Sequence, residues 1–218
     1  MIPTSWYVLA TNGRPMRNSL DSKLRLLDAA VGAIRAKGYD ATTVDDVCHA
    51  AALTKGAFFH HFRSKDDLAV AAAQRWGDTT GALFEAAPHH LPADPRDRVL
   101  AYVDFRKAIL QGAPKDFSCL LGTMVQATYD SQPAIREACR AGIFGHAATL
   151  VDDIAAAKAL YAPNAAWTAE SLALHTQAVL QGAFILAKAD GGPRIAADCL
   201  DHLRRYLELL FANDKSRE

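Results

Sequence analysis

Side chains that bind phosphate gather between residues 43 and 65, where hydroxyl groups, amines and imidazoles recur at short intervals. Hydroxyls and cations donate hydrogen bonds to phosphate oxygens, and the unpaired amides at a helix start bind anions in the same way. This mixture indicates contact with a phosphate backbone. The expected donors are Thr43, Thr54, Lys55, His60, His61 and Lys65.

Other residues of the same segment are suited to approach bases. On a helix that turns by ~100° per residue, Phe58 and Phe62 lie about 40° apart and mark the inward face. An outward glycine lets a backbone come close to DNA, and a small alanine leaves room for a base edge or a thymine methyl group. The expected reading surface comprises Gly56, Ala57, Phe59 and His60.

Four helix signals position these side chains. The first helix is expected from about residue 20 to residue 37, where apolar residues recur at helical spacing before Gly38. Capping residues mark the other three helix starts: Thr43 with Asp46, Thr54, and Ser64 with Asp67. Two short helices joined by a turn and braced by a preceding helix form a helix-turn-helix DNA-binding unit. Thr43 and Thr54 have an alternative role as caps alone.

The charge distribution agrees with a polyanionic partner for this part of the chain. The 218 residues contain 24 Lys and Arg and 24 Asp and Glu, so the net charge is zero. Between Arg14 and Lys65, however, nine basic residues stand against five acidic ones. A basic amino-terminal quarter on a mildly acidic body indicates that the two parts have different tasks.

Catalytic and metal-binding sites are not expected anywhere in the sequence. Asp152–Asp153, and Ser171 near His175, lack the nucleophile, base and orienting group that catalysis needs at predictable spacing. Cys199 with His202, and Cys139 with His146, share helix faces but have no third ligand beside them. We therefore predict no catalytic residue, no metal and no cofactor. A helical enzyme is the alternative function class.

The sequence predicts a reduced, cytoplasmic protein with no membrane partner. Its apolar runs fall short of the ~18–20 residues that span a bilayer. The short apolar stretch Trp6–Ala10 has no basic residue before it, unlike a secretory signal. The four cysteines form no CxxC pair.

The rest of the chain is expected to be helical as well. Helices are predicted at about 96–111, 117–130, 133–160, 167–189 and 194–212, with breaks at Gly, Pro or Asn and no convincing strand. The last two carry wide apolar stripes, so we expect a homodimer through them. A charge introduced at Leu203 or Leu207 is expected to disrupt that dimer.

The amino-terminal helices resemble those of a known protein family. The stretch Ser22–Leu68 closely resembles the tetracycline-repressor (TetR/AcrR) family of bacterial regulators. The motifs that carry it are Lys37–Gly38–Tyr39, Thr42–Thr43–Val44, Lys55–Gly56–Ala57–Phe58–Phe59–His60–His61–Phe62 and Ser64–Lys65–Asp66–Asp67–Leu68. By this resemblance, Thr43, Thr54, Lys55, Gly56, Phe59, His60, His61 and Lys65 occupy DNA-contacting positions. Phe59 departs from the family, which usually has Tyr there.

The resemblance implies a ligand-responsive repressor that binds a double-stranded, near-palindromic operator and is released by a small-molecule or electrophile inducer. The expected organisation is all-α: a flexible arm at 1–15, with a mis-called start as the alternative, a three-helix DNA-binding domain at 16–64, and a helical ligand-binding and dimerisation domain at 65–218.

Two features of the body are candidates for inducer recognition. Ser118–Cys119–Leu120–Leu121–Gly122 resembles a stretch of the family's electrophile-responsive, N-ethylmaleimide-sensing members, although Cys119 has an alternative as a packed core residue. Aromatic and soft apolar groups suit a small-molecule site, with ordinary core as the alternative. The candidate ligand-binding residues are Phe105, Cys119, Met124, Phe144, His175 and Phe184.

Overall fold

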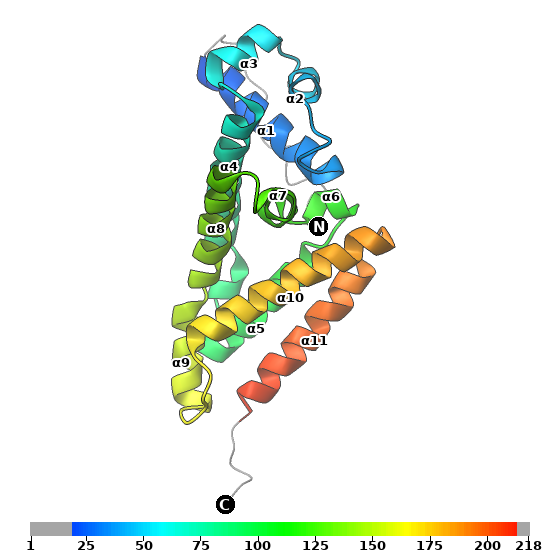
Figure 1. The fold of residues 1–218 in the computed structure, drawn as a ribbon. Helices are drawn as coiled ribbons and strands as arrows, with labels where there is room; N and C mark the ends of the chain where they lie inside the picture. Colours follow the sequence, from blue (N-terminus) through cyan, green and yellow to red (C-terminus); the bar gives the residue numbers. More distant parts are fainter. Residues whose placement is uncertain (1–18, 213–218) are drawn as a thin grey trace, which may run out of the picture. The chain divides into compact units, whose positions relative to one another are not determined.

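The computed structural model describes residues 19–212, and these residues form helices joined by short connections, without a strand among them (Figure 1). The all-α prediction is confirmed. The predicted arm at 1–15 lies outside the described residues. The helices are α1 (Ser19–Lys37), α2 (Val44–Ala50), α3 (Lys55–His61), α4 (Lys65–Glu85), the short 3-10 helix η1 (Pro88–His90), α5 (Pro95–Ala108), α6 (Pro114–Phe117), α7 (Leu120–Thr128), α8 (Pro133–Ala148), α9 (Val151–Tyr161), α10 (Ala169–Asp190) and α11 (Arg194–Leu210).

Helices α1 to α4 follow their local sequence signals closely. Helix α1 buries Leu27, Val31 and Ile34 on one face, which is the spacing expected of an amphipathic helix. It ends where Gly38 adopts a φ of +85°, a conformation that costs a glycine little. The Asp67 amide donates to the Ser64 hydroxyl at 3.1 Å, so the predicted cap of α4 is confirmed.

Two predicted helices differ from the structure. The first break, at Ser118 and Cys119, separates α7 from the short helix α6, so the helix predicted at 117–130 begins only at Leu120. The second break, at Thr149 and Leu150, divides the helix predicted at 133–160 into α8 and α9. At the second break, the Thr149 hydroxyl donates to the His146 carbonyl at 2.8 Å and competes with the helical bond. The Leu150 amide bonds a carbonyl only three residues back, which tightens the turn and buries Leu150.

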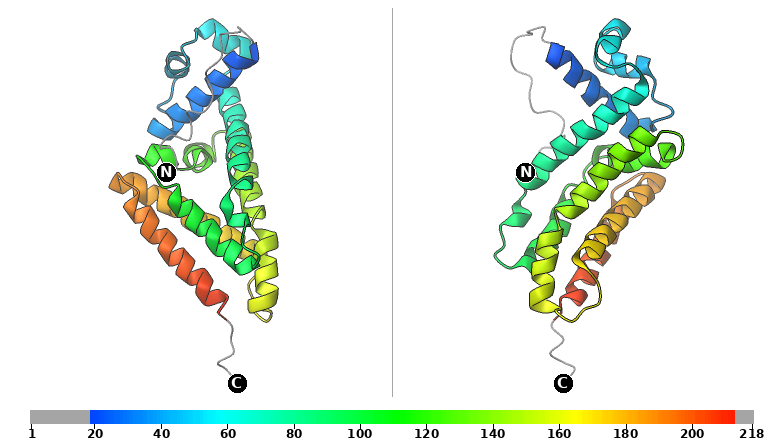
Figure 2. Two further views of the ribbon diagram at one scale, coloured as in Figure 1. Left: turned by 180° about the vertical axis from the view of Figure 1, so that it is seen from behind. Right: turned by 60° about the vertical axis from the view of Figure 1, so that its left-hand side comes forward.

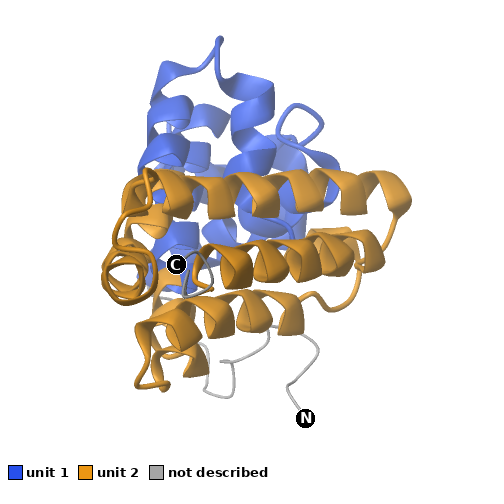
Figure 3. Ribbon diagram, turned by 90° about the horizontal axis from the view of Figure 1, so that it is seen from below, with its two compact units in different colours: residues 1–80, 118–142 blue, residues 81–117, 143–218 orange. Residues whose placement is uncertain are grey.

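The described chain separates into two compact units, coloured in Figure 3. Within the described residues, unit 1 comprises 19–80 and 118–142, and unit 2 comprises 81–117 and 143–212. Helices α4 and α8 each supply residues to both units. Packing thus groups α7 and most of α8 with the amino-terminal helices, whereas the predicted functional boundary at residue 64 stays a prediction.

In unit 2, α10 and α11 lie side by side, and α5 packs against α11 and α9 (Figures 1 and 2). Thr168 caps the start of α10, and Gly191 ends it with a φ of +83°. Both helices turn apolar residues into the unit, including Leu180, Leu203 and Leu207. Among residues 19–212, no helix is both long and apolar enough to cross a membrane.

Candidate nucleic-acid interface and effector residues

The turn between α2 and α3 is held from α1. The guanidinium of Arg25 donates to the carbonyl oxygens of Ala51 and Ala52, and the Leu53 amide bonds the Cys48 carbonyl at 2.9 Å. Ala52 has a φ of +50°, which is unfavourable for a residue with a Cβ atom. These bonds compensate that strain and fix the direction in which α3 leaves the turn.

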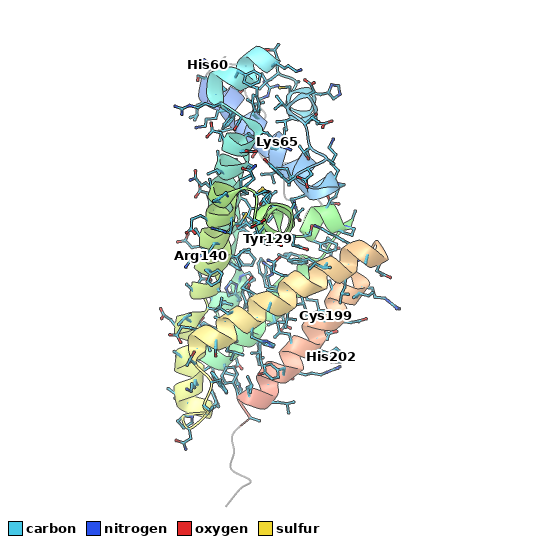
Figure 4. All side chains as sticks on the ribbon, viewed as in Figure 1. His60, Lys65, Tyr129, Arg140, Cys199 and His202 are labelled. Atoms are coloured by element: carbon cyan, nitrogen blue, oxygen red, sulfur yellow. The ribbon has the colours of Figure 1, made fainter. Side chains whose placement is uncertain are left out.

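Helix α3 has the two faces predicted for it. Phe58 is fully buried and Phe62 is 3% exposed, so they anchor the inward face. Gly56, Phe59 and His60 are exposed on the outward side, with 59% of Phe59 accessible. Figure 4 labels His60 on α3 and Lys65 at the start of α4. Ala57 is half-buried between the two faces.

Packing within the chain does not require a glycine at position 56. A Cβ atom added there lies 3.6 Å from the Thr54 hydroxyl oxygen, which is ordinary van der Waals contact. A glycine inside a helix costs about 1 kcal/mol relative to alanine. The fold of this chain therefore does not explain why this exposed position lacks a side chain.

Both threonines of the site act as helix caps. The Thr43 hydroxyl oxygen accepts from the Asp46 amide at 3.1 Å and donates its proton to the Asp46 carboxylate at 2.6 Å. Lys37 lies 2.6 Å from the same carboxylate and, with the Thr43 hydrogen bonds, holds the pKa of Asp46 well below its usual range. The Thr54 hydroxyl accepts from the Ala57 amide at 3.2 Å. Its own proton remains suited to a phosphate oxygen.

The two lysines of the site differ in their contacts. Lys55 lies 2.9 Å from Asp45, and both side chains are more than half exposed, so this pair exchanges readily for a phosphate. Lys65 donates to the Tyr39 carbonyl at 3.2 Å and lies 4.1 Å from the centre of the Tyr39 ring. The Tyr39 hydroxyl donates in turn to Asp66. Lys65 thus braces the loop after α1 in addition to its predicted phosphate contact.

The adjacent histidines have different environments. His61 is half-buried, with its Nε2 atom 2.6 Å from the Ser22 hydroxyl of α1. Burial, followed by the charges of His60 and Lys23, lowers the pKa of His61. His60 is exposed on α3. His60 is therefore the more accessible of the two imidazoles to an outside partner.

The six candidate effector residues do not form one site. Cys119 and Met124 belong to unit 1, where Met124 is fully buried and Cys119 is partly exposed at the start of α7. Phe105, Phe144, His175 and Phe184 belong to unit 2. Phe144 is half-exposed, and the exposed His175 packs on the ring of Tyr206, 5.2 Å away between centres. Phe105 and Phe184 belong to an aromatic cluster of unit 2.

That cluster surrounds Phe84 in unit 2 and contains two histidines that the sequence did not suggest for effector binding: His89, and His146, which was considered only as a metal ligand. The Phe84 ring lies 5.6 Å from Phe105 and 4.5 Å from His146 between centres. His146 continues the buried α8 stripe of Ile135 and Cys139, and this spacing is a signal for an inward imidazole. Figure 4 labels Cys199 and His202 on α11, and no group of three possible metal ligands occurs within 19–212.

Known proteins resemble different parts of this chain, and they differ in sequence identity and in the share of the chain they cover. Residues 26–72 match the profile of the family described as "Bacterial regulatory proteins, tetR family". The HTH-type transcriptional regulator CymR of Pseudomonas putida is 32% identical over 126 residues, which cover 55% of this chain and 56% of that protein. The chain spans between 35% and 56% of the length of the curated relatives it matches.

Solved structures share the fold of nearly the whole described chain. A TetR transcriptional regulator from Chloroflexus aurantiacus has a TM-score of 0.75 at 25% identity, over 88% of this chain and 96% of that one. The reduced form of NemR from E. coli has a TM-score of 0.70 at 21% identity, over 85% and 96%. The family description and the regulator names agree with the expectation that this chain is not an enzyme.

Proposed function

Since this chain belongs to the TetR family of bacterial regulatory proteins by its amino-terminal domain, we propose that it is a ligand-responsive repressor that binds a near-palindromic operator as a homodimer. Residues 16–64 bind the DNA, and residues 65–218 bind the inducer and form the dimer. Two copies related by two-fold symmetry read two half-sites about 34–36 Å apart, or a variant of that spacing.

One observation carries this proposal: the side of α3 opposite its buried aromatic anchor is exposed. Phe58 and Phe62 fix the helix, while Gly56 and His60 lie on its accessible side. The major groove of B-DNA is wide enough to admit an α-helix, and the second helix of a helix-turn-helix unit lies there. The Thr54 hydroxyl and Lys55 lie beside the start of the same helix, where they are suited to hold it against phosphates.

The dimer forms on the outer face of α10 and α11. Leu186 is 48% exposed on α10, and Tyr206 and Leu209 are 42% and 75% exposed on α11. The ring contact between His175 and Tyr206 links the two helices within this face. Monomeric soluble proteins rarely leave such a run of large apolar side chains in water, and a second copy covers it.

Release from DNA follows when a ligand favours a dimer with a different separation of the two α3 helices. To change the repressor from mostly DNA-bound to mostly free, the ligand must bind the DNA-free form of the dimer more tightly than the DNA-competent form by several kcal/mol.

An electrophile is the second kind of inducer. Cys119 and Cys199 are partly exposed, whereas Cys48 and Cys139 are buried, so within unit 1 a reagent reaches Cys119 first.

Selection from a random oligonucleotide pool tests the proposed function. The full chain is expected to retain a short near-palindromic duplex, with binding that weakens steeply as salt rises because phosphate contacts release counterions. Enrichment of no sequence, or affinity independent of salt, contradicts the proposal. For the electrophile route, a small maleimide is expected to release this duplex from the native chain and to have no effect on Cys119→Ser. Release from that variant contradicts the role of Cys119.

A further inference from the structure

We propose that the inducer is a small organic monoanion with an apolar body, held in unit 2 by the guanidinium of Arg106 and surrounded by the aromatic cluster of Phe84, Phe105 and Phe184. This inference rests on the proposed function, because it names the chemistry of the ligand that the repressor senses.

Arg106 of α5 lies within cation–π distance of two aromatic rings. The carbon at the centre of its guanidinium lies 5.0 Å from the centre of the Phe84 ring and 5.6 Å from that of Phe184. A cation–π contact with carbon rings leaves the N–H groups of the guanidinium available for hydrogen bonds. Those N–H groups form a fork that matches the two oxygens of a carboxylate.

The neighbouring charges of unit 2 are already paired, and Arg106 is the exception on α5. Arg98 lies 2.7 Å from Asp153, and Lys107 lies 2.6 Å from Asp201. Within residues 19–212, no ion pair or hydrogen bond joins the Arg106 side chain to an acid. A half-buried cation without a carboxylate is a specific place for an anionic ligand.

Polar groups of the same cluster lie within hydrogen-bonding distance of one another. The Gln177 amide donates to the Tyr102 hydroxyl oxygen at 3.2 Å, and the same hydroxyl lies 2.9 Å from His146 Nε2. His89 is 4% exposed, and its buried Nδ1 has no hydrogen-bond partner among the described residues.

The two histidines are uncharged near pH 7. Burial is the main cause and lowers the pKa of His89 to about 4 and that of His146 to about 3. Asp153, the acid that acts on His89, is engaged with Arg98. The cluster therefore presents one positive charge, that of Arg106, within aromatic walls. This combination matches one negative charge attached to an apolar body, in preference to a cation or a dianion.

Calorimetric titration of the full chain, without DNA, tests this inference. The probes are benzoate and hexanoate, and their neutral counterparts are benzamide and hexanamide. The carboxylates are expected to bind about tenfold or more tightly than the amides, because a charge-assisted pair is lost with the amide. Arg106→Gln is expected to abolish this preference, and Arg106→Lys to retain part of it.

Controls separate the site from a general effect of charge or folding. Arg194→Gln removes one positive charge at the exposed start of α11 and is expected to bind the probes like the native chain. Far-ultraviolet circular dichroism checks that each variant remains folded; if Arg106→Gln unfolds, the comparison of Arg106→Lys with the native chain decides.

Equal affinity for acid and amide, no binding of either acid at millimolar concentration, or an unchanged preference in Arg106→Gln overturns the inference. Because no DNA is present, failure to find an operator leaves this titration interpretable, and the two proposals fail separately.

Discussion

Arg35 of α1 donates a hydrogen bond from Nε to the carbonyl oxygen of Ser118, 3.0 Å away and 83 positions later in the sequence. The arginine is 7% exposed, and its guanidinium lies 4.7 Å from the centre of the Trp76 ring. Ser118 immediately precedes Cys119 at the start of α7. The helix that braces the α2–α3 turn through Arg25 is thereby fixed to the segment that carries the candidate sensor cysteine.

Replacing Arg35 by methionine is expected to destabilise unit 1. The substitution removes the charge-assisted bond and leaves the Ser118 carbonyl without this donor, at a cost of about 1–3 kcal/mol. Urea unfolding followed by circular dichroism measures the change in the free energy of unfolding. Arg140→Met, at an exposed position of α8, serves as the matched control. Equal stability of both variants shows that the Arg35 bond contributes nothing measurable.

Replacing Phe59 by tyrosine is expected to tighten operator binding. The exposed ring lies on the outward side of α3, and a hydroxyl there adds one hydrogen bond to phosphate, worth ~0.5–1.5 kcal/mol. Fluorescence anisotropy with the selected duplex measures the affinity. Unchanged or weaker binding means that another group already contacts that phosphate, and His60→Ala then identifies whether it is His60.

An acidic residue at Leu209 is expected to separate the dimer into monomers, because a charge in the apolar face of α10 and α11 loses its hydration on association. Sedimentation velocity measures the oligomeric state. Leu160→Glu is the matched control, since Leu160 is 62% exposed on α9, outside that face. A Leu209→Glu dimer places the interface elsewhere. Leu203 and Leu207, which the sequence suggested for this test, are buried within unit 2, so a charge there tests folding instead.

Stability is expected to fall as pH decreases from about 6.5 toward 4 because of His89 and His146. Their folded pKa values, about 4 and about 3, lie below the ordinary value of 6.5, so the unfolded chain binds more protons in this window. The contribution is complete above pH 6.5 and declines by ~1.4 kcal/mol per pH unit for each histidine. Burial lowers both pKa values most. The charge of His90 lowers the pKa of His89 further and that of Arg106 lowers the pKa of His146, whereas Asp153 raises the pKa of His89.

Urea unfolding at a series of pH values checks this expectation. In His146→Gln, the free energy of unfolding is expected to depend less steeply on pH than in the native chain, by the ~1.4 kcal/mol per pH unit that one histidine contributes. His175→Gln, at an exposed position of α10, is the control and is expected to keep the native dependence. A native-like slope in His146→Gln contradicts the assignment.

The amino-terminal helices were predictable because their signals are local. Thr43, Thr54 and Ser64 each supply a side-chain bond within the next turn, and the spacing of Phe58 and Phe62 fixes the inward face of α3. None of these features depends on distant parts of the chain.

The body was less predictable because its outcome depends on tertiary packing. On α11 the apolar residues cover more than half a turn, and composition cannot show that Leu203 and Leu207 face inward while Tyr206 and Leu209 face out. The six candidate effector residues divide between two units for the same reason, with Cys119 and Met124 in unit 1 and the aromatic candidates in unit 2. Arg106 escaped notice because a lone basic residue on a helix is usually solvated.

Gly56→Ala tests most directly whether α3 is shaped for DNA. The added Cβ has room in the free protein, so the free energy of unfolding is expected to stay equal or to rise by up to about 1 kcal/mol. Affinity for the selected duplex, measured by anisotropy on the same preparation, is expected to fall at least tenfold, because the methyl group separates the backbone from the groove. Native affinity in Gly56→Ala contradicts the assignment of this face as the reading surface.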